Sequence, residues 1–158
     1  YSFPTRRSSD LVTLRTTVMV GFPGENRKAF ETLLSFVKKA KFDRLGCFIF
    51  SPQEGTLAAS LPDACAPRTA KSRMKLIMLT QNEIMEQKNR EKIDQTVEVL
   101  VEGYDRYAER WYGRSDADAP EVDGKVFFIA CGLHPGDRVN VKLTGAVGLD
   151  LIGEKVTL

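Results

Sequence analysis

The sequence is poor in the side chains that most often carry catalysis or bind metals. It has one histidine, His134, and three cysteines, Cys47, Cys65 and Cys131, in 158 residues. The cysteines are odd in number and far apart, so they fit neither a disulfide framework nor a metal-binding Cys-x2-Cys pair. We expect reduced, mostly structural thiols. His134 stands in a Pro-Gly-Asp turn without a nearby serine or cysteine, which predicts a loop residue and disfavours acid–base catalysis.

Long hydrophobic runs and a strong charge of one sign are also missing. No segment approaches the roughly 18 consecutive apolar residues of a membrane span, and the N-terminus lacks the apolar core of a secretory signal. We therefore expect a cytoplasmic monomer that does not contact membranes. The net charge of +2 is too small to indicate nucleic-acid binding by itself. The length fits one moderate domain or two small ones.

The first eleven residues are expected to be foreign to the protein. Residues 2–11 read SFPTRRSSDL, which matches the translation of a common sequencing-library adapter. We exclude residues 1–11 from the fold prediction as an artefact. We also expect the natural coding sequence to extend upstream.

The next part of the chain, residues 12–93, predicts α/β structure. Residues 14–20 and 45–50 are apolar runs typical of buried strands, each ending at a Gly- or Pro-containing turn. Between them an apolar face at helical spacing is formed by Phe30, Leu33, Leu34 and Val37. Strand, helix and strand in this order predict a parallel sheet. A long loop over 51–67 then leads to a second helix from about Arg68 to Ile93, with the polar Gln81 at an expected apolar position.

Residues 94–158 change from helical to alternating periodicity. Short strands are predicted at 96–101, 125–130, 138–144 and 149–152, separated by Gly, Pro and Asp turns. Several strands in so short a segment predict a small closed or partly open antiparallel barrel, because closure removes exposed sheet edges. The fold class is therefore a partial parallel α/β unit followed by a small β-barrel.

Two loops follow the carboxyl ends of the two predicted parallel strands. These loops, Gly21-Phe22-Pro23-Gly24-Glu25 and Phe50-Ser51-Pro-Gln-Glu-Gly-Thr56, are expected to border one cleft. Glu25 disfavours a phosphate site, since its carboxylate would lie beside the amides that should bind the anion. Two interpretations of the first loop stay open: contact with a ligand, or a tight turn in which Glu25 complements the helix dipole.

With Arg15-Thr-Thr and Phe42-Asp-Arg-Leu-Gly-Cys-Phe48, these loops resemble the end of the radical-SAM barrel in methylthiotransferases. In that family the late strands help to hold S-adenosylmethionine. The resemblance implies a TIM-like barrel end and assigns five residues to the rim of the cofactor cleft: Gly21, Phe22, Pro23, Gly24 and Ser51.

A second resemblance lies in Gly113-Arg-Ser115 and Asp118-Ala-Pro-Glu-Val-Asp-Gly124, which are similar to the OB-like TRAM barrel of ribosomal-protein aspartate methylthiotransferases of the RimO type. It implies that Arg114, Glu121 and Asp123 contact the substrate. A ribosomal protein of the small subunit is favoured as that partner, because a carboxylate-rich run is a poor surface for phosphates. Binding of tRNA, as in sibling enzymes, and a stand-alone binding module are the alternatives.

The chain departs from this family in its cysteines. The cluster motif Cys-x3-Cys-x2-Cys is absent, and the three thiols offer no spacing that would hold a 4Fe-4S cluster. We therefore expect the chain as given to hold no cofactor and to be inactive. The intact parent would add a methylthio group to an aspartate of the ribosomal protein.

Four aromatic residues stand among arginines in the predicted barrel: Tyr104, Tyr107, Trp111 and Tyr112. Stacking on nucleic-acid bases is one interpretation. Aromatic side chains that bridge the barrel and the second helix are the favoured one.

Overall fold

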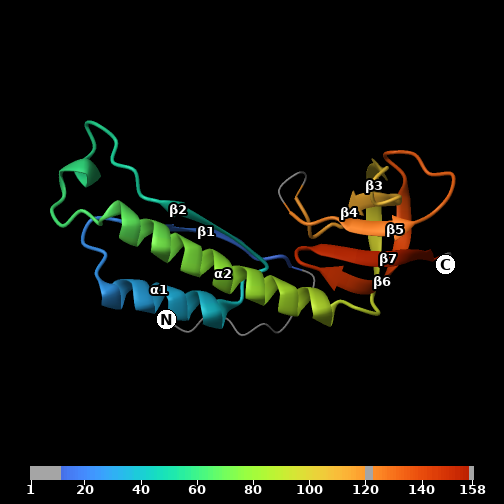
Figure 1. Ribbon diagram of the computed structural model, residues 1–158, viewed down its shortest axis with the longest axis horizontal. Coiled ribbons are helices and arrows are strands. Elements are labelled where there is room, and N and C mark those ends of the chain that lie inside the picture. The colour runs from blue at the N-terminus through green and yellow to red at the C-terminus, as the bar shows by residue number, and fades with distance from the viewer. Residues whose placement is uncertain (1–11, 120–122, 157–158) are drawn as a thin grey trace. The chain divides into compact units, whose positions relative to one another are not determined.

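The computed structural model describes residues 12–119 and 123–156, so the expected adapter segment, residues 1–11, lies outside the described residues. The chain divides into two compact units (Figure 1). One unit comprises Arg15–Lys92 with Ala146–Leu149, and the other is built around Ile93–Gly145 and the strand that follows Leu149. Among the described residues, no helix has both the length and the apolarity needed to cross a membrane.

The first unit is an α/β layer. Strand β1 (Arg15–Val20) and strand β2 (Arg44–Ile49) pair in parallel. They are connected by helix α1 (Arg27–Ala40), and helix α2 (Pro67–Glu91) follows after a loop that contains a 3-10 turn at Leu57–Ser60. In Figure 1 both helices lie along the two-stranded sheet. The predicted strand–helix–strand unit and its parallel sheet are confirmed.

Local signals explain where α1 begins and ends. The side chain of Asn26 accepts a hydrogen bond from the backbone N–H of Ala29 at 2.9 Å, which caps the helix start. Lys41 adopts a left-handed conformation and its N–H donates to the carbonyl of Val37, which ends the helix. The basic Lys38 and Lys39 in the last turn complement the helix dipole.

The core of this unit lies between the helices and one face of the sheet. Six buried residues form it: Val20, Phe30, Val37, Leu45, Ile77 and Ile84. Gln81 is also buried, 1% exposed, although it stands at an apolar position of α2. Its amide Nε2 donates to the carbonyl oxygen of Phe42 at 2.9 Å, which ties α2 to the turn before β2.

The second unit is a closed barrel of five strands in the order β3-β4-β5-β7-β6. The strands are β3 (Thr96–Asp105), β4 (Arg110–Arg114), β5 (Val126–Ile129), β6 (Arg138–Val147) and β7 (Asp150–Val156). β3 is long enough to pair with β6 through its first half and with β4 through its second half. Strand β4 was not predicted from the sequence.

The barrel is mixed and not wholly antiparallel, because β5 and β7 pair in parallel. The reason is the number of strands. In a closed ring, antiparallel pairing at every interface requires an even number of strands, so a ring of five must contain a parallel pair. The antiparallel prediction was therefore right for the pairs β3–β4, β3–β6 and β4–β5 and wrong for β5–β7.

The barrel interior is filled by side chains from alternate positions of the strands, as small barrels require. Its buried residues include Val99, Val101, Val126, Phe128, Val141 and Leu143. Gly113, on β4, lies against the backbone of β3, and a Cβ atom there would come within 2.1 Å of the Leu100 carbonyl oxygen. The glycine of the Gly113-Arg-Ser115 motif therefore permits this close packing.

Candidate functional site

The turn after β1 is built around Gly21. This residue is buried with φ at +78°, and a Cβ atom on it would lie 2.7 Å from the Cβ of Ala70 on α2. Only glycine combines this conformation with so close an approach. The N–H of Gly24 donates to the carbonyl of Asp63 at 3.0 Å, so the turn is also held to the long loop that follows β2.

The Glu25 carboxylate organises this turn. Its Oε2 accepts a hydrogen bond from the N–H of Gly21 at 2.9 Å, and its Oε1 pairs with Arg73 of α2 at 2.6 Å. Both side chains of the ion pair are largely buried, 11% exposed for Glu25 and 12% for Arg73. The same guanidinium nitrogen donates to the Glu25 carbonyl at 2.9 Å. Helix α1 starts at Arg27, so Glu25 precedes the helix and serves the turn.

The two loops predicted to share a cleft do lie together. The rings of Phe22 and Phe50 meet edge to face at 5.0 Å, and the N–H of Phe50 donates to the carbonyl of Val20 at 2.8 Å. Phe22 is 39% exposed and Ser51 is exposed, whereas Pro23 is half-buried. The predicted rim residues therefore surround the carboxyl ends of β1 and β2 within one unit.

Cys47, on β2, has the properties of a structural thiol and not of a reactive one. Partial burial and, to a smaller extent, the negative charge of Glu25 raise the pKa of its thiol to about 11. A neutral thiol is a poor nucleophile and a poor metal ligand. Cys65 has its Sγ 3.7 Å from an Arg73 nitrogen, and Cys131 is exposed.

The thiols do not fit an iron–sulfur cluster. Within residues 12–119 and 123–156, no three His, Cys, Asp or Glu side chains are grouped closely enough to hold a metal ion. The α/β unit offers a glycine turn, aromatic faces and an already paired carboxylate. These groups can border a ligand.

The predicted substrate contacts of the barrel have partners of their own. The Arg114 Nε donates to Glu102 Oε1 at 2.9 Å, and Asp123 Oδ2 accepts a hydrogen bond from the N–H of Ala119 at 2.7 Å. Glu121 lies outside the described residues. Arg114 and Asp123 thus have separate partners, Glu102 on β3 and the Ala119 amide.

Part of the carboxylate-rich run after β4 stabilises the loop in which it lies. Asp118 is 8% exposed, and its Oδ2 accepts hydrogen bonds from the hydroxyl of Ser115 at 2.6 Å and from the Ser115 N–H at 3.3 Å. Ser115 is equally buried, at 7%. The hydrogen bonds between Ser115 and Asp118 stabilise the loop, which gives these two motif residues a structural role.

The aromatic residues of the barrel make their described contacts within it. Trp111 donates through Nε1 to the carbonyl of Ala130 at 3.1 Å and meets Tyr104 edge to face at 5.4 Å. Tyr112 packs beside Phe127, with the Lys125 ammonium 4.0 Å from its ring centroid. Sequence reasoning missed β4, which carries Trp111 and Tyr112, because its five residues, Arg-Trp-Tyr-Gly-Arg, place a glycine and an arginine after the two aromatics and show no alternating apolar pattern.

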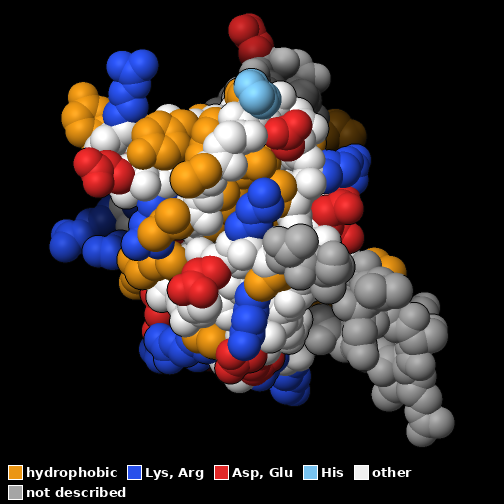
Figure 2. All heavy atoms as spheres, turned by 90° about the vertical axis from the view of Figure 1, so that its right-hand side faces the viewer, with side chains coloured by type: hydrophobic (Ala, Val, Ile, Leu, Met, Phe, Trp, Pro, Cys, Tyr) orange, Lys and Arg blue, Asp and Glu red, His pale blue; other side chains and the backbone are white. Residues whose placement is uncertain are grey.

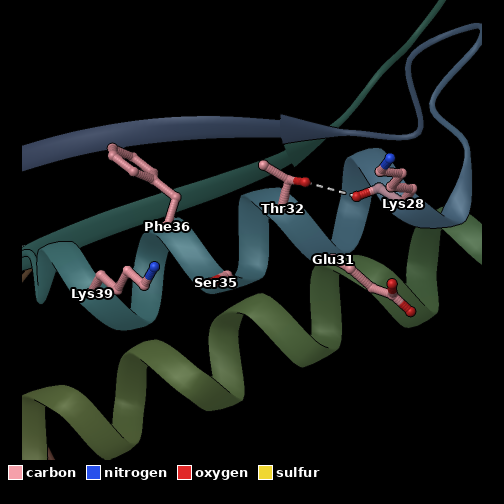
Figure 3. Close-up of a pocket in the computed structure, with 6 residues that line it drawn as sticks. All are labelled: Lys28, Glu31, Thr32, Ser35, Phe36 and Lys39. Carbon is pink, nitrogen blue, oxygen red and sulfur yellow. Dashed lines mark hydrogen bonds between the residues drawn. The ribbon is translucent and has the colours of Figure 1, made fainter. Parts of the chain in front are cut away.

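A shallow hollow of about 430 Å³ lies along α1 (Figure 3). Its lining side chains all come from this one helix: Lys28, Glu31, Thr32, Ser35, Phe36 and Lys39. None of the residues predicted from the sequence to border a ligand belongs to it. The hollow therefore adds no candidate site.

Comparison with known families first defines the class of the second unit. Residues 93–156 match the model of the TRAM domain, in agreement with the closed five-stranded barrel. The chain as a whole is related to the C-terminal part of RimO-type methylthiotransferases.

The relatives are named ribosomal protein uS12 methylthiotransferase RimO. The protein of Geobacter sulfurreducens is 43% identical over 147 residues, which are 92% of this chain and 33% of that protein. The protein of Desulforudis audaxviator is 46% identical over 89% of this chain and 31% of its own length. That of Caldicellulosiruptor saccharolyticus is 46% identical over 96% and 34%, respectively. The chain thus spans about one third of the length of these curated relatives.

Proposed function

We propose that the chain is the C-terminal piece of a cytoplasmic enzyme that adds a methylthio group to an aspartate of the small-subunit ribosomal protein uS12. The similarity to uS12 methylthiotransferases over 92% of the chain is the observation that carries the proposal. In this proposal residues 12–93 are the end of the radical-SAM core and residues 94–158 are the TRAM domain. Iron–sulfur clusters and S-adenosylmethionine belong to the intact enzyme, and this piece by itself is inactive.

The α/β unit contributes part of the cofactor cleft. Gly21, Phe22, Pro23, Gly24 and Ser51 are its rim. The geometry supports this role because Phe22 and Phe50 bring the two loops together at the carboxyl edge of a parallel sheet, where such folds bind ligands. The sequence lacks the Cys-x3-Cys-x2-Cys motif, so in this proposal the reductive chemistry depends on residues elsewhere in the parent.

The barrel contributes substrate binding. Arg114, Glu121 and Asp123 are the contacts that the family resemblance suggests. Arg114 already pairs with Glu102, and Asp123 already holds the Ala119 amide, so each would have to exchange or share its partner on binding. A tRNA substrate is the alternative, and a barrel that acts as a stand-alone binding module is another.

The test is to recover the upstream reading frame and assay the complete protein. We expect that frame to carry a Cys-x3-Cys-x2-Cys motif. The reconstituted enzyme, supplied with iron, sulfide and S-adenosylmethionine, is then offered uS12 and, separately, total tRNA. Methylthiolation of uS12, read by mass spectrometry, supports the proposal. Modification of tRNA alone, or a frame without the three cysteines, contradicts it.

A further inference from the structure

The charges of the chain are divided unevenly along the sequence. Residues 12–92, which form the α/β unit, contain fourteen Lys and Arg against eight Asp and Glu, a net charge of +6. Residues 93–156, which form the barrel, contain seven Lys and Arg against twelve Asp and Glu, a net charge of −5. The small net charge of the whole chain therefore conceals two larger and opposite ones. Such an asymmetry is typical of proteins that contact nucleic acids or membranes.

The excess of positive charge lies on the helices of the α/β unit. Helices α1 and α2 contain ten Lys and Arg against four Asp and Glu. The barrel side of the molecule differs, because Figure 2 faces it and shows Asp and Glu side chains interspersed with Lys and Arg. A polyanion meets repulsion as well as attraction on such a mixed surface. The helices are therefore the better surface for a polyanion.

Five of these cations form two exposed stripes. We define the basic face as Lys28 and Lys39 of α1 together with Arg68, Lys71 and Lys75 of α2, all of which are exposed. Helical spacing places Lys28 and Lys39, three turns apart, on one stripe of α1 (Figure 3). The three α2 residues, at i, i+3 and i+7, share a second stripe. The buried residues of both helices face the core instead.

The basic face is not neutralised by neighbouring carboxylates. In the ranges that the structure describes, none of its five side chains forms an ion pair, whereas Arg73 of α2 pairs with Glu25 and Lys88 pairs with Asp43. The ion pairs that hold α2 in place are thus made by other residues. The charges of the basic face remain available to a partner.

The stability of the helices does not explain these charges. Lys28 and Arg68 are each the second residue of their helix, and neither helix has an acidic residue in its first turn. The helix dipole disfavours a cation at this end. An anionic partner that covers the basic face would remove this unfavourable interaction.

The apolar residues of the helices distinguish between two kinds of polyanion. A helix that binds a membrane surface presents a broad apolar face together with its cations. The apolar faces of α1 and α2 are instead buried in the core. Leu76 and Leu79, 42% and 49% exposed, are too small an apolar surface to insert a helix into lipid. A chain of phosphates needs only the cations, and it binds to an open surface without an enclosing pocket.

We propose that the basic face binds RNA through its phosphate groups, as a docking partner that is not itself modified. That the nucleic acid is RNA rests on the proposed function, because a ribosomal protein is found together with RNA. The α/β unit then holds the enzyme to the RNA that accompanies its protein substrate. Contacts to phosphates carry no sequence information, so we expect little dependence on the base sequence.

The experiment titrates a fluorescein-labelled single-stranded RNA oligonucleotide with the 158-residue chain and follows fluorescence anisotropy at several salt concentrations. If all five side chains contact phosphates, a plot of the logarithm of the association constant against that of the salt concentration has a slope of about −3.5. In the double variant Lys71→Gln/Lys75→Gln we expect a slope that is shallower by about 1.4 and, at about 0.1 M salt, roughly 25-fold weaker binding.

The double variant Lys142→Gln/Lys155→Gln is the matched control. It removes the same charge from exposed positions of the barrel, so the affinity and the slope should stay unchanged. All four lysines are exposed, and an unchanged melting temperature of both variants verifies the fold.

Vesicles of phosphatidylglycerol are tested in parallel by co-sedimentation. Binding to vesicles but not to RNA, lost in Lys71→Gln/Lys75→Gln, assigns the basic face to membranes and overturns the inference. Failure to bind RNA even at low salt overturns it too, as do equal losses of affinity in the two double variants. The complete parent separates this inference from the proposed function: a parent that modifies uS12 although its basic face binds no RNA leaves the proposed function standing.

Discussion

At the scale of single residues, Glu25 is the residue on which most of the candidate cofactor rim depends. Its carboxylate connects the backbone of Gly21 with Arg73, and Arg73 stands 48 positions after Glu25 in the sequence. One side chain thereby holds the turn after β1 to helix α2. Such a largely buried pair is costly to break from one side, because the remaining charge loses its compensation.

We expect Glu25→Gln to lower the free energy of unfolding by about 2–3 kcal/mol. The amide can still accept from Gly21, but it leaves the Arg73 guanidinium without a counter-ion. Urea denaturation followed by circular dichroism measures the change. Glu31→Gln is the matched control, since it removes the exposed pair between Glu31 and Arg27 and should have no measurable effect. Equal losses in the two variants would show that the Glu25 ion pair is not important for stability.

The pH dependence of Cys47 alkylation tests the effect of the Glu25 carboxylate on a neighbouring group. With a pKa of about 11, roughly one thiol in a thousand is ionised at pH 8. We expect iodoacetamide at pH 8 to alkylate the exposed Cys131 first and Cys47 far more slowly, with the Cys47 rate rising as the pH approaches 11. Glu25→Gln should speed Cys47 alkylation, because it removes a charge that raises the pKa. Peptide mass spectrometry follows both sites, and equally fast labelling of both at pH 8 would contradict the assignment.

At the scale of elements, local patterns predicted β1, α1, β2 and α2 to within a few residues. Their apolar periodicity is long and each is bounded by Gly, Pro or a capping residue. β4 was missed because its packing depends on what lies across from it. The roles of Gly113 and Arg114 become clear only once β3 lies alongside, because Gly113 packs against the Leu100 carbonyl and Arg114 pairs with Glu102.

We expect Gly113→Ala to destabilise the barrel by about 2–3 kcal/mol, since the added methyl group would meet the Leu100 carbonyl on the neighbouring strand. Unfolding is followed through the fluorescence of Trp111, which lies on the same strand. Gly145→Ala is the control: its new Cβ would find only an ordinary contact, 3.9 Å from Ile152. A cost at position 113 no larger than at position 145 would mean that β3 and β4 can separate without penalty.

At the scale of the whole molecule, the two units differ in whether their sheets are closed. The barrel is closed, so its pairing needs no further strand. The α/β unit has a parallel sheet of two strands, and Met19 and Phe48 on it are 51% and 62% exposed. Parallel sheets are normally covered on both faces, and two strands rarely suffice for stability.

Limited trypsin digestion should therefore release a stable fragment that begins near Asp94 and contains Trp111. Cleavage is expected at Arg90 or Lys92, where α2 ends and the chain turns into β3. The remaining α/β part should be degraded or precipitate. Mass spectrometry and the retained near-UV signal of Trp111 identify the product. Loss of both parts at the same rate would argue against an independently folded barrel.

The sequence by itself determined the order of most elements, the pairing of two loops at one sheet edge and the family resemblance, because these depend on local periodicity and on short motifs. Only the tertiary structure decided that Glu25 binds Arg73, that Asp118 holds Ser115 within its loop, and that Tyr107 stands free in solvent. It also decided that β5 and β7 run parallel. Each of these depends on which segments meet after the chain has closed on itself, and neither periodicity nor composition contains that information.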